Sequence, residues 1–357
     1  MKIVIVGAGP AGLSFAYFIK KACRNHSVQV LERREPDDSL GWGVTLSSGN
    51  LGLLDYDLDV HKVVDVSTIS YAGHEYLETP VNLVTISRDA LISFLRERCL
   101  SVGVDIRFNA PVKSLGDIDM SRLDLIVGAD GVNSVVRKGY AEYFAPAMTT
   151  SALSHLWLAT PKLFGRAIIA SFRDYNGALF SGWGYQFSDQ LSSFIVESTS
   201  HGLEALGLTA PGNEEGARRI ELAFRSELGG QPLLTHGPIH ASKFVQIKNR
   251  RWHHQRVVLI GDAAHTTHYS KGYGTEHAIR DAMSLSAHLS RSSDLSSALV
   301  SFERERMPET ALNQSRAMSS HNWYHNVLRG HERGSASAVI DAIHEVEKQI
   351  ERGECIQ

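Results

Sequence analysis

The chain has 357 residues, which is enough for one large domain or two joined domains with a sizeable core. Hydrophobic residues make up 43% and charged residues 21%, which is ordinary for a soluble globular protein. The formal net charge of -3 argues against general nucleic-acid binding and gives no sign of a polyanionic partner.

The first predicted elements form a βαβ unit. Lys2–Val6 is a continuous β-branched run, which is typical of a strand buried on both faces. A turn is predicted over Gly7–Gly12, and Leu13–Ala22 then has the apolar spacing of a helix. Val28–Leu31 is predicted to be a second buried strand, which completes the unit.

The turn has the sequence GAGPAG and predicts a dinucleotide site. Gly7 allows the tight turn, Gly9 lets the backbone approach a pyrophosphate, and Gly12 allows close packing of helix on strand. The helix N-terminus offers free N–H groups to the phosphates. Glu32, 20 residues after Gly12, is placed to accept hydrogen bonds from ribose hydroxyls. A glycine-rich turn without a ligand is the alternative, and this unit alone does not separate FAD from NAD.

The rest of the chain divides into a mixed section, a strand-rich section from about residue 150 to 250, and a C-terminal part. After Asp281 the pattern is helical almost to the end. The predicted elements between these limits are the strand Val81–Ile86, the amphipathic helix Arg88–Leu100, and the strands Asp105–Phe108, Leu123–Val127, Ser192–Glu197 and Val257–Ile260.

Two later segments decide between FAD and NAD. Residues 124–137 read DLIVGADGVNSVVR, and residues 261–282 read GDAAHTTHYSKGYGTEHAIRDA. Together with the glycine turn they resemble the group A flavoprotein monooxygenases, the aromatic hydroxylases of the p-hydroxybenzoate hydroxylase fold. Asp130-Gly131 matches the family's DG motif for FAD and NAD(P)H, and Gly261-Asp262 matches its GD motif for the FAD ribityl or ribose region. The likeness extends from residue 1 to about residue 330.

A narrower resemblance rests on shorter segments. GWGV from Gly41, FIVES from Phe194 and SSHNWYHNV from Ser319 are similar to the salicylyl-CoA 5-hydroxylase and 2-aminobenzoyl-CoA monooxygenase group. They are also similar to the violacein-pathway hydroxylase that acts on a tryptophan-derived bis-indole. These relatives share the loop pattern His–aromatic–Ser–x–Gly–x–Gly–Thr, which residues 268–275 reproduce. Lys271 and Glu276 differ from the residues expected there in the subgroup, and this difference concerns the substrate, not the flavin chemistry.

The resemblance implies an α/β fold in which a Rossmann-like FAD-binding domain is interleaved with a β-sheet substrate domain, followed by C-terminal helices. We expect the FAD-binding domain to comprise residues 1–75, 85–150 and 250–290, the β-rich substrate domain residues 76–84 and 151–249, and the C-terminal helices residues 291–357.

The implied activity is FAD-dependent hydroxylation of an aromatic ring. NADPH or NADH would bind transiently and reduce the flavin, and O₂ would form a flavin C4a-hydroperoxide that transfers oxygen. The expected substrate is a CoA- or carrier-bound aryl acid or a tryptophan-derived indole. A dearomatising or epoxidising flavin oxygenase, or a flavin-binding protein without catalysis, are the alternatives. We expect a monomer or homodimer with no nucleic-acid or membrane partner.

The loop after the GD motif is expected to border the reaction chamber. Gly272 and Gly274 leave the backbone free to lie against a planar ring, and the helix starting at Tyr273 can turn its N–H groups to the flavin. His268, Tyr269 and Lys271 are the catalytic candidates, although His268 can equally shape the loop and Lys271 can be an exposed lysine. His265 and His277 are expected to be structural, and the histidine spacing predicts no metal site.

Two sets of contact residues follow from the motifs and the resemblance. The expected FAD contacts are Gly7, Gly9, Pro10, Ala11, Gly12, Glu32, Arg33, Gly43, Val44, Arg88, Val112, Asp130, Gly131, Asp262, Gly272, Tyr273, Gly274 and Thr275. The expected substrate contacts are Thr45, Trp183, Tyr185, His268 and Ser270. For Trp183 and Tyr185, sheet core is an equal alternative, and Trp157, Trp252 and Trp323 are expected in the core.

The cysteines predict the compartment. Cys23, Cys99 and Cys355 show no metal-binding or redox spacing, so we expect reduced thiols in a cytoplasmic protein. The apolar run at the N-terminus is short and broken by glycines, and no stretch approaches about 20 apolar residues. Neither a secretory leader nor a membrane span is therefore expected.

Overall fold

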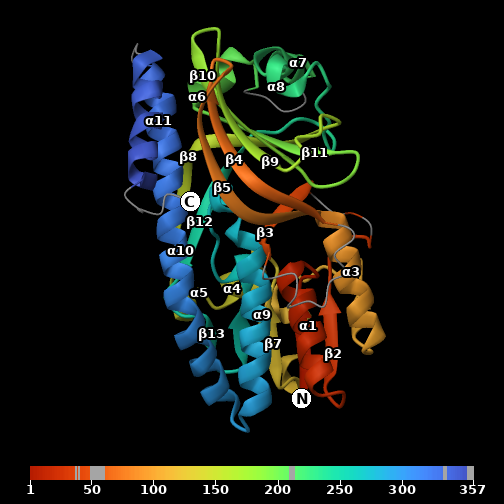
Figure 1. The fold of residues 1–357 in the computed structure, drawn as a ribbon. Helices are drawn as coiled ribbons and strands as arrows, with labels where there is room; N and C mark the ends of the chain where they lie inside the picture. Colours follow the sequence, from red (N-terminus) through yellow and green to blue (C-terminus); the bar gives the residue numbers. More distant parts are fainter. Residues whose placement is uncertain (37, 39–40, 49–60, 209–213, 333–335, 352–357) are drawn as a thin grey trace. The chain divides into compact units, whose positions relative to one another are not determined.

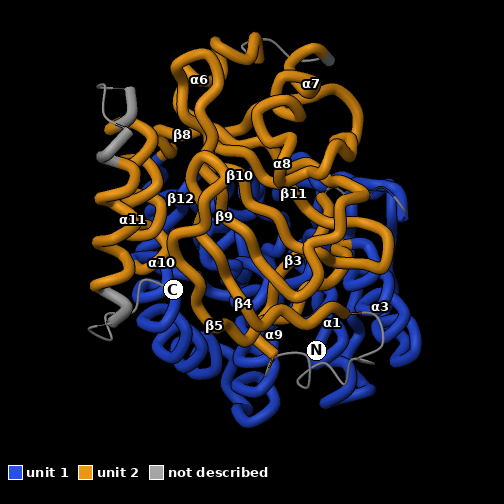
Figure 2. Tube along the Cα trace, turned by 45° about the horizontal axis from the view of Figure 1, so that its top comes forward, with its two compact units in different colours: residues 1–39, 89–149, 245–315 blue, residues 40–88, 150–244, 316–357 orange. Residues whose placement is uncertain are grey.

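The computed structural model describes residues 1–36, 38, 41–48, 61–208, 214–332 and 336–351. The chain folds into two compact units, each assembled from three separate segments (Figure 2). Unit 1 comprises residues 1–39, 89–149 and 245–315, and unit 2 comprises residues 40–88, 150–244 and 316–357. The chain therefore alternates between the units.

Unit 1 is built on a six-stranded sheet with the order β13-β14-β7-β1-β2-β6. The sheet is parallel apart from β13, which pairs with β14 in the antiparallel sense. The β-branched and leucine residues of β1, β7 and β14 are almost completely buried, as expected for strands covered on both faces. The strands are β1 (Lys2–Val6), β2 (Ser27–Leu31), β6 (Asp105–Arg107), β7 (Leu125–Gly128), β13 (His253–His254) and β14 (Val257–Leu259).

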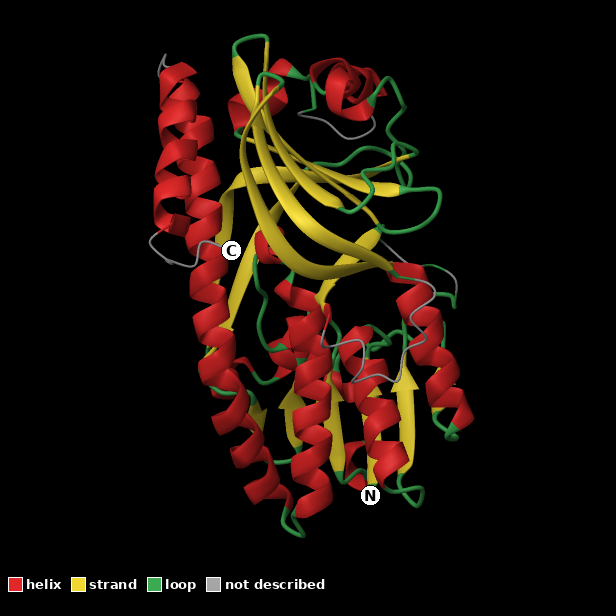
Figure 3. Ribbon diagram, viewed as in Figure 1, coloured by secondary structure: helices red, strands yellow, loops and turns green. Residues whose placement is uncertain are grey.

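Helices α1 and α9 pack against each other along this sheet (Figure 3). Proline at the first position of α1 suits a helix start, because its missing N–H has no intrahelical partner there. The helices of unit 1 are α1 (Pro10–Ala22), α3 (Arg88–Ser101), α4 (Val135–Gly139), α5 (Ala141–Phe144), α9 (Tyr273–Arg291) and the first part of α10 (Leu295–Glu332). Its short 3₁₀ helices are η3 (Leu115–Asp117), η4 (Met120–Arg122), η5 (Gly261–Ala263) and η6 (Tyr269–Lys271).

Unit 2 is built on an eight-stranded sheet with the order β12-β8-β11-β10-β9-β4-β5-β3 (Figure 1). The pairs β8–β11, β11–β10, β10–β9, β4–β5 and β5–β3 are antiparallel, and the pair β4–β9 is parallel. The chain passes between the units within β8 and within β12. The strands are β3 (Gly43–Ser47), β4 (Lys62–Tyr71), β5 (His74–Ser87), β8 (Pro146–Thr160), β9 (Ala167–Tyr175), β10 (Ala178–Gln186), β11 (Ser192–Ser198) and β12 (Ser242–Asn249).

Both faces of this sheet carry apolar clusters. Phe180, Phe194 and Phe224 belong to the cluster on one face, which packs with α6 (Ser200–Ala205), α7 (Glu214–Ala223) and α8 (Arg225–Leu228). Leu179 and Phe172 belong to the cluster on the other face, with the second part of α10 and with α11 (Ala336–Glu351). Neighbouring residues of a strand point to opposite faces, so Leu179 and Phe180 serve different clusters. The second face is called the inner face below.

The α/β fold with a Rossmann-like unit, an interleaved β-rich unit and C-terminal helices is confirmed. The compact units nevertheless divide the chain at other residues than the expected domains. Residues 62–71 and 85–87 belong to unit 2 together with the expected residues 76–84, because β4 and β5 hydrogen-bond within the eight-stranded sheet. Residues 291–315 belong to unit 1.

The tryptophans were predicted with mixed success. Trp252 is 2% exposed, and Trp323 is partly buried against the inner-face cluster. Trp157 is 36% exposed, so its predicted place in the core is wrong. Its neighbours on β8, Leu156 and Leu158, belong to the cluster of Phe180, Phe194 and Phe224. Because successive residues of a strand point to opposite faces, Trp157 points away from that cluster.

Candidate functional site

The three glycines of the first turn have different surroundings. A Cβ at Gly7, whose φ is +104°, would lie 2.4 Å from the Ala129 carbonyl oxygen, and one at Gly12 would lie 2.0 Å from the Gly7 carbonyl oxygen. Only glycine fits at either position. At Gly9 an added Cβ would meet no atom of the described residues within 4 Å. The turn is therefore packed at Gly7 and Gly12 and open at Gly9.

Glu32 holds this turn in place. Its Oε2 accepts a hydrogen bond from the Ala8 N–H at 2.8 Å, and its Oε1 accepts one from the Arg34 N–H at 3.0 Å. A carboxylate oxygen can accept more than one hydrogen bond, so both oxygens keep capacity for the hydroxyls of a ligand.

Asp130 lies after β7 and organises the start of α4. Its Oδ2 accepts the Val135 N–H at 2.7 Å, and its Oδ1 accepts the Ser134 hydroxyl at 2.5 Å. Burial raises the pKa of Asp130, while these hydrogen bonds act in the opposite direction. The next residue, Gly131, has a φ of +76°, and its Cβ position is open to 4 Å among the described residues.

Gly261 brings a third chain segment to the glycine turn. It follows β14, has a φ of +57°, and a Cβ there would lie only 2.8 Å from the Cβ of Ala11 in α1. Ala263 is fully buried, whereas Asp262 between these two residues is exposed. The carboxyl ends of β1, β7 and β14 thus place Gly7, Asp130 and Asp262 at one edge of the sheet.

The loop between η5 and α9 is shaped by His268. This residue is 1% exposed, and its Nδ1 accepts the Ser270 N–H at 3.3 Å, which caps η6. In the neutral ring the hydrogen is then on Nε2, which makes that atom a donor. The Tyr269 ring lies 4.2 Å from the His268 ring, measured between centroids.

Gly272 ends η6 and begins α9. Its φ is +66°, a conformation in which glycine is strongly favoured. At Gly274 an added Cβ would meet nothing within 4 Å in the part of the chain that the structure describes. The predicted helix start at Tyr273 is confirmed. Lys271, Tyr273 and Thr275 are half-buried.

The predicted contacts of unit 2 centre on the peptide groups of Gly43. The Gly43 N–H donates to Ser193 Oγ at 2.9 Å, and the Tyr185 hydroxyl donates to the Gly43 carbonyl at 2.7 Å. Ser193 and Tyr185 are cross-strand partners on β11 and β10. Burial raises the pKa of Tyr185 to about 12, so it remains a hydrogen-bond donor at neutral pH.

A second set of contacts fixes the residues just before Gly43. The Arg88 N–H donates to the Trp42 carbonyl at 2.8 Å, and the indole N–H of Trp42 donates to the Trp157 carbonyl at 3.2 Å. The Trp42 ring stacks on His236 with centroids 3.8 Å apart. Val44 and Thr45 follow on β3, where Thr45 pairs with Thr85 of β5.

Comparison with known proteins identifies the family. A family described as FAD binding domain matches residues 110–313, and one described as NAD(P)-binding Rossmann-like domain matches residues 5–41. Protodeoxyviolaceinate monooxygenase from Chromobacterium violaceum is 30% identical over 95% of this chain and 93% of its own. Salicyloyl-CoA 5-hydroxylase from a Streptomyces species is 31% identical over 99% of this chain and 71% of its own. The protein belongs to the FAD-dependent aromatic monooxygenases. Its cofactors are FAD and NAD(P)H.

Other similar proteins agree with this family. The 3-hydroxy-4-methyl-anthranilyl-[aryl-carrier protein] 5-monooxygenase from Streptosporangium sibiricum is 31% identical over 91% of the present chain and 89% of its own. The solved structure of 2-methyl-3-hydroxypyridine-5-carboxylic acid oxygenase in its tetrameric form has a TM-score of 0.73 at 20% identity, covering 96% of this chain and 95% of its own. A probable FAD-dependent monooxygenase from Pseudomonas aeruginosa has the same TM-score at 17% identity, covering 96% and 99%. These two structures show a shared fold.

The residues of unit 1 fit the flavin cofactor of this monooxygenase. The Cβ positions of Gly9, Gly131 and Gly274 are open to 4 Å among the described residues. No side chain of the described residues caps α1, so its first turn can offer N–H groups to a pyrophosphate. A ligand that lies against the backbone requires tight chain packing, as at Gly7 and Gly12, and glycines without neighbouring atoms, as at Gly9, Gly131 and Gly274.

Sequence reasoning missed Arg137, which connects two motifs of the monooxygenase. Its side chain is 2% exposed, its Nη1 donates to the Ala263 carbonyl at 2.9 Å, and its Nη2 donates to the Val132 carbonyl. Burial lowers the pKa of Arg137, and the charges of Asp130 and Asp262 counteract this effect. The arginine that closes the segment DLIVGADGVNSVVR was the available signal.

A buried ionic network under the GD motif was also missed. Asp281 Oδ2 accepts the Gly261 N–H at 3.0 Å and lies 2.7 Å from His265 Nε2, while Oδ1 accepts Arg306 Nε at 3.0 Å. Burial alone would raise the pKa of Asp281, but His265 and Arg306 lower it to about 2. Arg306 Nη2 lies 3.1 Å from His277 Nδ1. The structural roles expected for His265 and His277 agree with these contacts.

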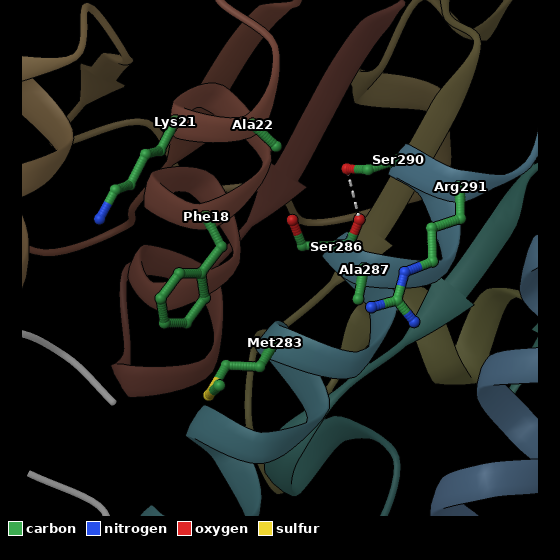
Figure 4. Close-up of a pocket in the computed structure, with 8 residues that line it drawn as sticks. All are labelled: Phe18, Lys21, Ala22, Met283, Ser286, Ala287, Ser290 and Arg291. Atoms are coloured by element: carbon green, nitrogen blue, oxygen red, sulfur yellow. Dashed lines mark hydrogen bonds between the residues drawn. The ribbon is translucent and has the colours of Figure 1, made fainter. Parts of the chain in front are cut away.

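A surface pocket of about 370 Å³ lies between α1 and α9 (Figure 4). It is remote from the motifs, because Met283 is already ten residues beyond the start of α9 at Tyr273, roughly 15 Å along a helix. None of the predicted site residues lines it. Its lining consists of Phe18, Lys21 and Ala22 from α1, and Met283, Ser286, Ala287, Ser290 and Arg291 from α9.

Within the described residues, no helix of the monooxygenase is both long and apolar enough to cross a membrane. Cys23 and Cys99 are free thiols, and Cys355 lies outside the described residues. Burial raises the pKa of Cys99 to about 12, which keeps its sulfur protonated and unreactive.

Proposed function

We propose that this monooxygenase hydroxylates an aromatic ring carried by a CoA or carrier thioester, or the ring of a tryptophan-derived indole. The support comes from the names of three relatives that are similar along most of their length. The observation that carries the proposal is the loop from Gly261 to Gly274. It contains the exposed Asp262 and ends at the start of α9, where Gly272 is the N-cap and an added Cβ at Gly274 would meet no described atom within 4 Å.

The FAD contacts proposed in unit 1 follow its geometry. The N–H groups of Gly9, Ala11 and Gly12 bind the pyrophosphate, and Pro10, which has no N–H group, contacts it. Glu32 and Arg33 bind the adenosine ribose. Asp262 accepts hydrogen bonds from the ribityl or ribose hydroxyls. The remaining proposed contacts of this unit are Gly7, Val112, Asp130, Gly131, Gly272, Tyr273, Gly274 and Thr275. Bound FAD supplies the acceptance of hydride from NAD(P)H and the activation of O₂.

Residues of the loop before α9 prepare the chemistry. The N-terminus of α9 carries a positive dipole end, which stabilises negative charge placed near Gly274. His268 donates a hydrogen bond from Nε2 to an oxygen of the substrate, since Nδ1 is engaged by Ser270. Tyr269 and Ser270 line the space for the aromatic ring, and Lys271 provides a positive charge for an anionic group.

The other proposed contacts belong to unit 2. Gly43, Val44 and Arg88 contribute FAD contacts, and Thr45 and Trp183 contact the substrate. Tyr185 acts as a positioning residue, because its hydroxyl is committed to the Gly43 carbonyl. In functional terms, residues 1–75, 85–150 and 250–290 serve FAD, and residues 76–84 and 151–249 serve the substrate.

NADPH consumption tests the proposal directly. The purified protein is expected to be yellow, or to become so with added FAD, and to oxidise NADPH faster in the presence of an indole or an aryl thioester. Mass spectrometry should show one added oxygen on the ring. A colourless protein that takes up no FAD contradicts the proposal outright.

The same assay separates the alternatives. A product that gains oxygen and loses aromaticity identifies a dearomatising or epoxidising oxygenase. A yellow protein whose rate of NADPH oxidation rises with none of the tested indoles and aryl thioesters is a flavin-binding protein without catalysis. Comparison of NADH with NADPH at equal concentration decides the reductant.

We also propose a cytoplasmic location and a monomer or homodimer. The location rests on three cysteines without disulfide spacing, and cell fractionation tests it. Light scattering of the FAD-loaded protein tests the oligomeric state.

A further inference from the structure

The inner face of the unit 2 sheet carries a row of polar residues beside an apolar cluster. Glu197 of β11 is 1% exposed and pairs across the sheet with Ser181 of β10 and with His155 of β8. The apolar cluster beside this row includes Leu179 and Phe172. A carboxylate buried next to an apolar cluster is costly, so it must interact with groups that donate hydrogen bonds.

Polar groups gather around Glu197 within the unit. The Ser181 hydroxyl donates to Glu197 Oε2 at 3.4 Å, and a ring nitrogen of His321 lies within 4.8 Å of a Glu197 carboxylate oxygen. Burial raises the pKa of Tyr324 well above its ordinary value, and the charge of Glu197 raises it further. Three elements, β10, β11 and α10, thus converge on one carboxylate.

Trp183 supplies a donor on the same face. It lies two residues beyond Ser181 on β10, and its ring packs on Tyr324 with centroids 4.6 Å apart. Its indole Nε1 is buried, and within the described residues it has no hydrogen-bond partner. An indole N–H can only donate, and buried donors are almost always paired, so an acceptor from outside the chain is the natural partner.

We propose that Glu197 accepts a hydrogen bond from an N–H or O–H group of the aromatic substrate, and that Trp183 donates its indole N–H to a neutral carbonyl of the same molecule. This assignment rests on the proposed function, and it names the recognition residues that the function leaves open. Glu197 lies outside the predicted set of site residues, because a single glutamate within FIVES carries no spacing signal.

The two groups select a chemical class. A carboxylate acceptor favours an amino, hydroxyl or indole N–H group on the ring, and it repels a free carboxylate through like charge. A thioester or amide carbonyl carries no charge and suits the indole donor. Acceptance of the substrate hydrogen bond by Glu197 also pushes electron density into the ring, which aids attack on an electrophilic oxygen. The structure therefore favours donor-bearing aryl thioesters and indoles over free aryl acids.

Paired substrates test this assignment on the FAD-loaded full chain. The probes are indole against 1-methylindole, and an aminoaryl thioester against the same thioester without its amino group. The wild-type protein is expected to prefer the donor-bearing member by roughly 10- to 100-fold in kcat/KM, the range of one charge-assisted hydrogen bond. Glu197→Gln should reduce this preference to within about threefold, and Glu197→Asp should restore part of it.

Control variants separate recognition from folding. Glu204→Gln changes an exposed glutamate of the same unit and should leave the preference unchanged. Trp183→Phe should weaken binding of carbonyl-bearing substrates roughly 10-fold or more while indole itself is little affected. If Glu197→Gln fails to fold, Glu197→Asp still tests Glu197, because it moves the carboxylate and should reduce the preference, and Trp183→Phe tests the indole donor.

The outcomes distinguish this inference from the proposed function. A protein that binds no FAD, or oxidises no NADPH with any aromatic substrate, contradicts the function. A protein that hydroxylates indole and 1-methylindole equally well, or whose preference survives in Glu197→Gln, leaves the function intact and overturns the role of Glu197. Equal loss of kcat/KM for both members of a pair in Glu197→Gln assigns Glu197 to structure alone.

Discussion

Tyr185 donates its hydroxyl hydrogen to the carbonyl of Gly43 at 2.7 Å, over a separation of 142 residues in the sequence. The partner of Tyr185 across the sheet, Ser193, accepts the N–H of the same glycine. The two bonds hold both polar groups of Gly43, and the Phe187 ring fills the position where a Cβ would be. A sheet predicted to contact the substrate is thereby linked to a segment predicted to contact FAD.

Removal of one bond of this pair tests the link. We expect Tyr185→Phe to lower the free energy of unfolding by about 1 to 3 kcal/mol, because the buried Gly43 carbonyl loses its partner. FAD affinity should fall about 10-fold if Gly43 and Val44 contact the cofactor. Urea denaturation and a fluorescence titration of the apoprotein with FAD measure the two effects.

Tyr143→Phe is the matched control, because Tyr143 is 43% exposed in unit 1. It should alter neither quantity. Loss of stability in Tyr185→Phe with unchanged FAD affinity would show that the hydrogen bond from Tyr185 to Gly43 serves folding only.

A pair of glycine variants measures the packing of the GD motif on α1. Gly261 and Gly177 both have positive φ values, +57° and +78°, so alanine strains the backbone at either position by about 1 to 2 kcal/mol. At Gly177 the Cβ position is open among the described residues, whereas at Gly261 the Cβ would press on Ala11. We therefore expect Gly261→Ala to cost about 1 to 3 kcal/mol more than Gly177→Ala. It should also weaken FAD binding, which Gly177→Ala should not. Equal costs in urea denaturation would contradict the tight contact.

The parts of the fold and site that the sequence predicted are those with local signals. A β-branched run, a glycine turn and an acid at fixed spacing identify the first βαβ unit, because each role depends on neighbours in the chain. The same holds for the helix start after Gly272, which needs a residue that tolerates positive φ.

The parts that were missed depend on contacts between distant segments. Arg137 and Ala263 are 126 residues apart, and the arginine in the first segment does not indicate which distant carbonyl it binds. The place of residues 62–71 in the larger sheet follows from β-pairing, whose partner cannot be read from one strand. The exposure of Trp157 was misjudged because a large aromatic residue suggests burial, whereas its position on the strand decides the face.

Arg137 provides a prediction on the link between the DG and GD motifs. Its planar fork donates to the carbonyls of Val132 and Ala263 from two different nitrogens. Lysine keeps the charge but cannot reach both acceptors in this geometry, so Arg137→Lys should destabilise the protein by about 1 to 3 kcal/mol and weaken FAD binding. Arg122→Lys, at a side chain that is 81% exposed, is the neutral control. An unchanged denaturation midpoint and FAD affinity in Arg137→Lys would refute the link.

His277 predicts how stability depends on pH. Its pKa is lowered from the ordinary value of 6.5 to about 4, mainly by burial and also by the charges of His265 and Arg306, while Asp281 and Glu276 act in the opposite direction. Arg306 can only donate, so His277 Nδ1 must accept, which holds the ring neutral. The unfolded chain therefore binds a proton more readily than the folded protein.

The contribution of His277 is complete above pH 6.5 and is lost as the pH falls towards 4, by about 2 to 3 kcal/mol in total. His277→Gln cannot take up this proton. It should be less stable than the wild type at pH 7.5, because it loses the contact with Arg306, and the difference should shrink as the pH approaches 4. Urea denaturation at half-unit steps of pH measures both curves. His155 and His321 also have pKa values lowered by burial to about 4, so both proteins still lose stability over this range. If the two curves of unfolding free energy against pH are parallel, His277 takes no part in the loss of stability. If they converge, protonation of His277 in the network beneath the GD motif accounts for part of that loss.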